Sequence, residues 1–288
     1  MTCGLLNSPI LGTSIGTYQP ETTSWIIRTE AAGGTLSTGT KNAVDAFVVS
    51  CKAAAIFTKF KRLNLFCGSN FTACLSPLVN TAGTAMDTNV SMPSANYSES
   101  TGLLGNGTSY LDTGLVPNTT VPYNNWHMAN YVLAAPATST LEMGSMGHPN
   151  GNIQFRCGWN YGAGPSGQTV GLVVISGDYN IGLNPNFQTL GTAGATITNG
   201  LALASRTSAS SLWIRNTSGT VNQESTLGYS GQQVLPVNTF QVFTATLSGQ
   251  ISRFRLGSYS VGLGLTYSEM TSYLSIMQSF QAALGRAT

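Results

Sequence analysis

The residue types that carry hydrolytic chemistry are scarce in this sequence. Only two histidines, His127 and His148, and ten acidic residues are spread over 288 positions. A serine hydrolase of the α/β type needs a GxSxG turn, which is absent. For glycosidic cleavage the best available carboxylate pair is Glu142 and Asp178, on or beside expected strands. We therefore expect no enzymatic activity, and we expect His127 to be a hydrogen-bonded strand-end residue.

Glycine and cysteine patterns indicate no cofactor. Gly102, Gly105 and Gly107 are not followed by the lysine of a phosphate-binding loop. The five cysteines are odd in number and contain no CxxC pair, so they indicate neither a disulfide framework nor a zinc site. Calcium would need more carboxylates on adjacent loops. We expect mostly buried thiols, no metal and no cofactor.

Aromatic residues next to amides supply better chemistry for binding. Tyr123 and Trp126 flank two asparagines, and Trp159 and Tyr161 flank one. Such rings can stack on the apolar face of a sugar while the amides bind its hydroxyls. These four residues are one candidate ligand-binding site. The alternative is that they are core or strand-end aromatics.

A second candidate site is a cluster of positive charge. All lysines of the sequence fall within residues 41–61, where only Asp45 opposes them, and an arginine follows directly. Such a cluster can dock on an acidic partner, or it can form the solvated faces of helices. The candidate docking residues are Lys41, Lys52, Lys59, Lys61 and Arg62.

Composition excludes several classes of protein. Charged residues make up 8% of the chain, against about 25% in an ordinary domain. The net charge of +2 argues against nucleic-acid binding, and 42% hydrophobic residues argue against disorder. The most apolar stretch, residues 43–57, is interrupted by Asp45 and Lys52, so we expect no membrane insertion. Residues 1–12 lack the basic start of a signal peptide.

Helical periodicity appears at both ends of the chain. Residues 21–32 place Trp25 and Ile26 on one side and stop at two glycines, and a second helix is expected from Thr40. Its apolar face comprises Val44, Phe47, Val48 and Cys51, and we expect Ile56, Phe57 and Phe60 to continue it.

The C-terminal helix is signalled most clearly. Thr266 and Glu269 form a capping box, which predicts that the helix begins at Tyr267. Gly285 stands where a left-handed C-cap belongs. The expected buried stripe is Met270, Tyr273, Leu274, Met277, Phe280 and Leu284.

Between the helices the pattern is that of short strands separated by turn clusters. Residues 80–96 show no periodicity and are expected to be a loop or an irregular edge. Strands are expected at 63–67, 109–115, 126–134, 141–146, 153–159, 169–176, 200–206, 211–216, 239–246 and 251–261. This spacing predicts a mainly β protein, an antiparallel sandwich or jelly roll.

The expected organisation has three parts. Residues 1–62 form a helical segment, residues 63–265 the sandwich, and residues 266–288 a closing helix. A further boundary within residues 80–100 is the alternative.

Four stretches of the sequence resemble a known family. They are TGLLGNGTSYLDTGL at 101–115, ASRTSA at 204–209, YSVGLGL at 259–265 and MQSFQAALGR at 277–286. Together they are similar to phage virion structural proteins that carry a concanavalin A-like, laminin-G-type lectin sandwich with a closing C-terminal helix. The resemblance covers roughly residues 100–288 and carries no catalytic residues.

The resemblance implies a place on the exterior of a virion. The expected function is a non-enzymatic structural protein, a capsid decoration or head-fibre-type component made in the host cytoplasm. The alternative is a tail-associated, lectin-like protein that binds host surface glycans. The expected partners are other virion proteins and further copies of this chain, with a host glycan under the alternative. Nucleic acid and membrane are not expected partners.

Overall fold

The computed structural model describes residues 18–122, 125–134, 142–143, 146–147, 155–164, 167–176, 188–190, 200–208, 211–215, 221–222, 239–243 and 253–286. For residues 142–143, 146–147, 155–164, 167–176, 188–190, 211–215 and 221–222 the structure describes the backbone and, of the side chains, only that of Trp213. The short elements outside the sheets are the helices α3 (Phe71–Cys74) and α4 (Pro117–Thr120) and the 3-10 turns η1 (Phe57–Lys59) and η2 (Ser94–Asn96).

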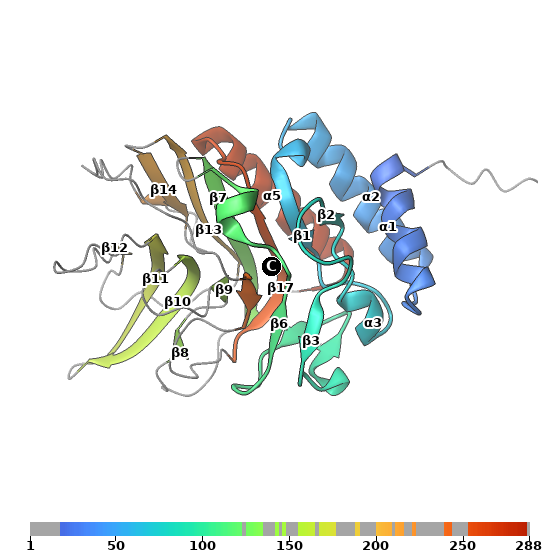
Figure 1. Ribbon diagram of the computed structural model, residues 1–288, viewed down its shortest axis with the longest axis horizontal. Helices are drawn as coiled ribbons and strands as arrows, with labels where there is room; N and C mark the ends of the chain where they lie inside the picture. Colours follow the sequence, from blue (N-terminus) through green and yellow to red (C-terminus); the bar gives the residue numbers. More distant parts are fainter. Residues whose placement is uncertain are drawn as a thin grey trace, which may run out of the picture.

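The described residues form two antiparallel sheets (Figure 1). The first, here called the central sheet, has the order β15 (Val221–Asn222), β14 (Ser211–Arg215), β13 (Gly200–Ser208), β7 (Trp126–Ala134), β17 (Arg255–Gly262), β1 (Phe60–Asn64) and β2 (Val79–Asn80), with β5 (Gly102–Leu104) beside β17 and β4 (Tyr97–Ser98) beside β5. The outer sheet has the order β12 (Gln188–Leu190), β11 (Gly167–Ser176), β10 (Phe155–Gly164), β9 (Met146–Gly147), β16 (Gln241–Val242), β6 (Tyr110–Asp112) and β3 (Thr88–Val90), with β8 (Glu142–Met143) on β10.

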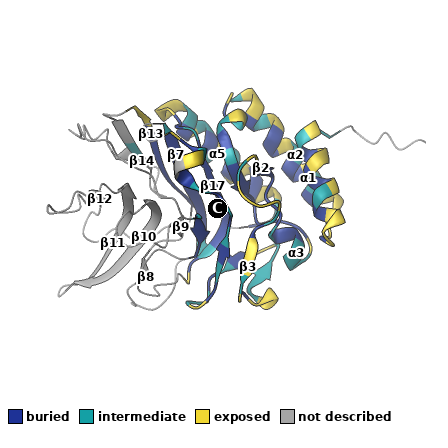
Figure 2. Ribbon diagram, in the orientation of Figure 1, coloured by how far each residue is buried: buried dark blue, intermediate teal, exposed yellow. Residues whose placement is uncertain are grey.

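Side chains alternate between two cores along the middle strands of the central sheet. Met128 and Val132 of β7 point to the core shared with the outer sheet, whereas Ala129 and Tyr131 point to the core beneath the helices. Strand β13 alternates in the same way. These strands are therefore buried on both faces, which Figure 2 shows as a dark-blue layer between the helices and the outer sheet.

The N-terminal helices cover one face of this sheet. Helix α1 spans Pro20–Ala31 and α2 spans Thr38–Ala53, and the residues predicted to be buried on each helix are buried. Ser37 caps α2 by accepting a hydrogen bond from the Thr40 amide at 3.0 Å.

Ile56 and Phe60 are buried in the same core as the apolar face of α2, and Phe57 packs against it, as predicted; the helix itself, however, does not continue through them. Ala55 has a φ of +56°, which ends the helical path, and Phe60 opens strand β1 instead. Since β1 pairs with β17, its residues belong to the sheet. The expected boundary after residue 62 thus falls inside a strand, and the division into three parts stays a prediction.

The C-terminal helix α5 (Tyr267–Ala283) begins at the predicted residue. Both hydrogen bonds of the capping box are present, and Gly285 has the left-handed φ of +70°. Most of the predicted stripe is buried, but Leu274 and Leu284 are only half-buried. Gln281, which was not predicted to be part of the stripe, is fully buried. A ring contact of 5.5 Å between Phe47 and Phe280 joins α5 to α2.

Gln281 is buried because strand β17 bulges beneath it. The pairing register of β17 with β7 shifts between Leu256 and Ser258. A Cβ on Gly257 would lie 2.8 Å from the side chain of Gln281, so the helix packs directly on the strand backbone there.

Most strand predictions hold, with shorter strands than expected near β6, β9 and β16. The stretch 80–96, expected to be a loop or irregular edge, contains only the short strand β3, the turn η2 and the end of β2. The prediction of a mainly β, antiparallel sandwich with helices at both ends is confirmed. Of the helices in the described part of the chain, none is long and apolar enough to cross a membrane.

Two neighbouring valines on α2 test the double-sided packing. Val48 is fully buried, whereas Val49 is 45% exposed. Replacing Val48 with Ala should lower the free energy of unfolding by about 2 kcal/mol, because it removes buried methyl groups. Replacing Val49 with Ala should change it by less than about 0.5 kcal/mol. Helix propensity cancels between the two variants, so equal urea midpoints would contradict this packing.

Candidate functional site

The aromatic residues expected to bind a sugar do not form one exposed group in the described structure. Trp126 is fully buried in the core between the sheets, which corrects its predicted role as a surface residue. Trp159 and Tyr161 lie two apart on β10, opposite Leu172 and Val170 of β11, and their side chains are outside the description. Tyr123 is outside the described residues.

An exposed aromatic pair that the sequence analysis missed lies elsewhere on the fold. Trp213 of β14 and Tyr267 at the start of α5 have ring centroids 5.8 Å apart, with their planes at 53°. Tyr267 is 51% exposed, and Trp213 is half-buried at the margin of the helix-covered core. We call Trp213 and Tyr267 the aromatic pair. Local patterns could not link them, because 54 positions separate them.

The connection from β17 to α5 fixes the position of Tyr267. The Leu263 amide donates to the Lys59 carbonyl at 2.8 Å, and the Gly264 amide donates to Asn125 Oδ1 at 2.8 Å. Ser205 Oγ exchanges hydrogen bonds with the backbone of Leu265, at 2.6 and 2.7 Å. Strand β13 therefore anchors this connection, and Ser205 stands opposite Trp213 in the β13–β14 pairing.

Gly264 is required within the same connection. A Cβ at this position would lie 2.1 Å from the carbonyl oxygen of Arg206. The close approach of the two backbones allows no larger residue without a shift.

His127 has the structural role predicted for it. Its side chain is fully buried, with Nδ1 2.6 Å from the Leu263 carbonyl and Nε2 3.2 Å from Ser260 Oγ. Because a carbonyl can only accept, Nδ1 carries the proton. Burial lowers the pKa of His127 to about 4, against the opposing effect of the hydrogen bond to Leu263. The ring is therefore neutral at physiological pH and ties β7 to the β17–α5 connection. His148 is outside the described residues.

Three of the predicted docking lysines are bound to carboxylates of this chain. Lys41 pairs with Glu30 at 2.6 Å, Lys52 with Glu21 at 2.5 Å, and Lys59 with Glu269 at 2.6 Å. The first two pairs tie α2 to α1, and the third ties η1 to α5. Burial opposes ionisation of Glu269, but hydrogen bonds from Lys59 and Thr266 lower its pKa overall. Lys61 is half-exposed, and its docking role stays a proposal.

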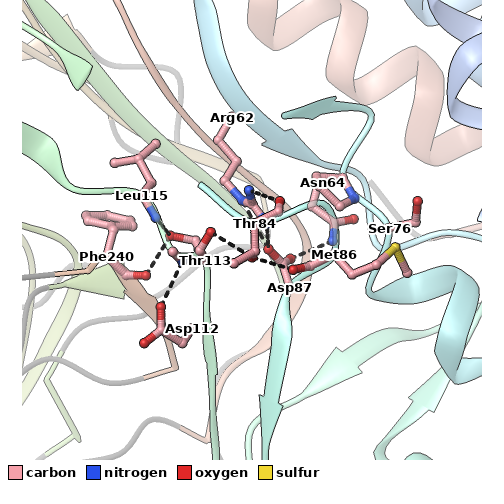
Figure 3. Close-up of polar contacts among 12 residues, drawn as sticks. Arg62, Asn64, Ser76, Thr84, Met86, Asp87, Asp112, Thr113, Leu115 and Phe240 are labelled. Carbon is pink, nitrogen blue, oxygen red and sulfur yellow. Dashed lines mark hydrogen bonds and ion pairs between the residues drawn. The ribbon is translucent and has the colours of Figure 1, made fainter. Parts of the chain in front are cut away.

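Arg62 does not belong to that surface cluster, which is a correction to the expected docking site. It is fully buried between the sheets, where Nη2 lies 2.5 Å from Asp87 Oδ1 (Figure 3). Its Nε is 3.0 Å from the Tyr259 hydroxyl. Nη1 donates to the carbonyls of Ala82 and Thr84 at 3.0 and 2.7 Å. Burial opposes the charge, yet the attraction of Tyr259 and Asp87 outweighs it and raises the pKa of Arg62.

Asp87 is as fully satisfied as its partner. The Tyr259 hydroxyl donates to Oδ1 at 2.6 Å, and Asn64 Nδ2 donates to Oδ2 at 2.7 Å. Asp87 lies in the stretch that shows no periodicity, so nothing in the sequence marked it. We call Arg62, Asn64, Asp87 and Tyr259 the buried polar cluster.

No described carboxylate side chain is left without a partner. Besides the acids above, Asp45 accepts from the Gln19 amide, Glu99 from Thr40 and the Gly68 amide, and Asp112 from Thr239 and the Gly114 amide. Glu142 lies on β8 with its side chain outside the description, and Asp178 is outside the described residues. In the part of the chain that the structure describes, no group of three or more His, Cys, Asp or Glu residues could hold a metal.

The sequence matches no protein-family model and no curated protein. The fold resembles domain 4 of AbnA, a GH43 extracellular arabinanase from Geobacillus stearothermophilus, solved with arabinotriose; identity is 13%, coverage 75% of this chain and 98% of that domain, and the TM-score 0.49. It also resembles the enzymatically active domain of bacteriophage CBA120 tailspike protein 2, with 16% sequence identity and a TM-score of 0.41. This match covers 66% of this chain and 29% of the tailspike domain. The fold also resembles a Trypanosoma rangeli sialidase, with 10% sequence identity and a TM-score of 0.47. The match covers 82% of this chain and 39% of the sialidase.

These comparisons correct one prediction. We expected no enzymatic activity, yet the similar structures include an arabinanase domain, a sialidase and the active domain of a tailspike. The prediction that the protein is not an enzyme is therefore wrong as it stood. The chain spans less than two fifths of the tailspike domain and the sialidase. No residue takes a role from any of these structures, and none of them identifies the sandwich as concanavalin A-like.

The buried polar cluster should be far more sensitive to mutation than a surface ion pair. Asp87→Ala leaves the Arg62 charge buried and unpaired, which should lower the free energy of unfolding by about 3–5 kcal/mol. Glu21→Ala removes the partner of Lys52 at a pair whose side chains are each 36% exposed, and should cost less than about 1 kcal/mol. Urea denaturation measures both. A loss below 1 kcal/mol for Asp87→Ala would show that the cluster is not needed.

Because the pKa of His127 is lowered in the folded protein, the free energy of unfolding should fall in mild acid. The unfolded imidazole takes up a proton near pH 6.5, whereas the folded one does so only near pH 4. The unfolded state therefore binds more protons in this window, and lowering the pH from 7.5 to 5 should cost about 2 kcal/mol. In His127→Asn this part of the pH dependence should disappear. An unchanged slope in that variant would mean that other groups cause it.

Proposed function

We propose that the protein is a glycan-binding component of the outer surface of a bacteriophage virion, associated with the tail. The aromatic pair carries this proposal. Tyr267 presents half of its surface to solvent beside a second, larger ring. Single exposed aromatics are common on protein surfaces, but two rings in contact form an extended apolar surface with polar edges.

The chemistry of the pair suits a saccharide. The 53° angle between the rings gives a bent surface, which can contact the C–H face of a sugar ring from two sides. The tyrosine hydroxyl and the indole N–H are able to bind sugar hydroxyls at the edges. Rigid aromatic side chains lose little conformational entropy on binding, and the anchored connection before α5 holds the backbone of Tyr267 in place.

The virion location rests on the sequence resemblance, and the concanavalin A-like type of sandwich is part of the same proposal. Other virion proteins and further copies of this chain are the proposed partners, and Trp159 and Tyr161 of β10 remain candidates for further glycan contacts. Capsid decoration is the competing function. No feature of the described surface favours it, whereas the aromatic pair favours glycan binding.

Tyr267 provides the test, because exposure makes it replaceable without loss of the fold. Tyr267→Ala should weaken binding to host-cell surface glycan by about tenfold, the loss of one stacking contact of about 1.4 kcal/mol. Tyr267→Phe keeps the ring and should bind within about twofold of wild type. The readout is the binding of purified protein to host cells or to their isolated surface polysaccharide.

Tyr18→Ala is the control, since Tyr18 lies at the start of the N-terminal helices, with its hydroxyl on Asn42. Equal binding by Tyr267→Ala and wild type, with equal melting temperatures, would refute glycan binding through the aromatic pair. If capsid decoration is the function, all these variants should bind alike. Removing the protein should then reduce the resistance of the particles to heat.

A further inference from the structure

A pocket unrelated to the aromatic pair opens between α1 and the β2 edge of the central sheet. Its volume is about 270 Å³, and Ser24 and Arg28 of α1 line it together with Phe57, Leu78, Asn80 and Thr81. Strand β14, which carries Trp213, lies on the far side of β13, β7, β17 and β1 from this edge. The pocket is therefore a separate place on the molecule.

Arg28 gives the pocket uncompensated positive charge. Its Nη2 donates to the carbonyl of Pro77 and, at 3.5 Å, to that of Leu78, while Nε is buried without a hydrogen-bond partner. No described carboxylate lies within ion-pair distance of it, in contrast to Arg62. Burial, and then the positive charge of Arg62, lower the pKa of Arg28. A bound anion would offset both effects, because an opposite charge favours the charged form of the guanidinium.

The other charges at the pocket do not cancel this one. Glu21 also lines the pocket, but its carboxylate is 2.5 Å from Lys52 Nζ, which neutralises it. Lys52 in turn lies 5.9 Å from the centre of the Phe57 ring. The net charge around the pocket is that of one guanidinium.

The remaining lining combines hydroxyl-binding groups with an apolar wall. Asn80 contributes an amide, and Ser24 and Thr81 contribute hydroxyls. Thr81 Oγ1 already donates to the Lys61 carbonyl at 2.9 Å, so its oxygen is left to accept from a ligand. Phe57 and Leu78 form the apolar side. Together these groups match a ligand that has one carboxylate, several hydroxyls and a C–H face.

We propose that this pocket binds a small hydroxylated carboxylate, the chemistry of an acidic monosaccharide. Arg28 binds the carboxylate, and Ser24, Asn80 and Thr81 bind the hydroxyls. This proposal stands on the pocket alone and holds whether or not the aromatic pair binds glycan.

Titration calorimetry of the purified chain tests the proposal with three probes. D-glucuronate should bind at least tenfold more tightly than D-glucose, which lacks the carboxylate, and more tightly than acetate, which lacks the hydroxyls. Equal affinity for either of these two and D-glucuronate would overturn the proposal.

Two arginine variants locate the site. Arg28→Gln should weaken glucuronate binding at least tenfold. Arg255→Gln is the matched control, because Arg255 is also a partly buried arginine whose described contacts are a hydroxyl and a carbonyl, those of Thr101 and Gly102. Wild-type affinity in Arg28→Gln, or an equal loss in the control, would overturn the assignment.

If Arg28→Gln unfolds because Pro77 and Leu78 lose their contact, the wild-type protein still gives an answer. Glucuronate should shift the backbone amide NMR signals of residues 78–81, and Asn80→Ala should weaken binding severalfold. Shifts confined to other parts of the chain would overturn the proposal.

Discussion

The ion pair between Arg62 and Asp87 is the interaction on which the arrangement of the two sheets depends. A guanidinium and a carboxylate that are both fully buried are tolerated only if all of their hydrogen-bonding groups are satisfied. Arg62 donates hydrogen bonds to the carbonyls of Ala82 and Thr84. Asp87 accepts hydrogen bonds from the side chains of Asn64 and Tyr259. The charge pair thereby fixes the path of a segment that has no hydrophobic periodicity of its own.

That segment joins the two sheets. The Thr84 amide donates to the Thr113 carbonyl at 3.0 Å, and Thr113 Oγ1 donates to the carbonyl of Phe240 at 2.7 Å (Figure 3). The contacts run from β1 of the central sheet to the ends of β6 and β16 in the outer sheet. Gly83 is essential to this path, because its φ is +88° and a Cβ would lie 2.3 Å from the Thr113 carbonyl oxygen.

Sequence patterns identified the elements whose signals are local. Thr266, Glu269 and Gly285 define the ends of α5 within a few residues, and a short run of strand-forming residues between turn clusters predicted the full extent of β7. Sequence patterns did not predict the buried polar cluster or the aromatic pair, because the members of each group come together only in the folded chain. Arg62 followed four lysines and resembled them in charge, and only the pairing of β1 with β17 and β2 places it inside. Trp126 was misplaced because its face of β7 is covered by the outer sheet, whose strands come from other parts of the sequence.

The pairing of β1 with β17 also has a consequence for how the protein is made. Phe60 lies opposite Gly262, and Phe47 packs on Phe280, so the first strand and the helix before it find their partners about 200 residues later. At about 5–20 residues per second, a ribosome needs on the order of ten to forty seconds to supply them. During that time the part of the apolar face of α2 that packs on α5 is uncovered. Nascent chains should therefore engage chaperones, and rapid synthesis at high concentration should favour the aggregation of incomplete chains.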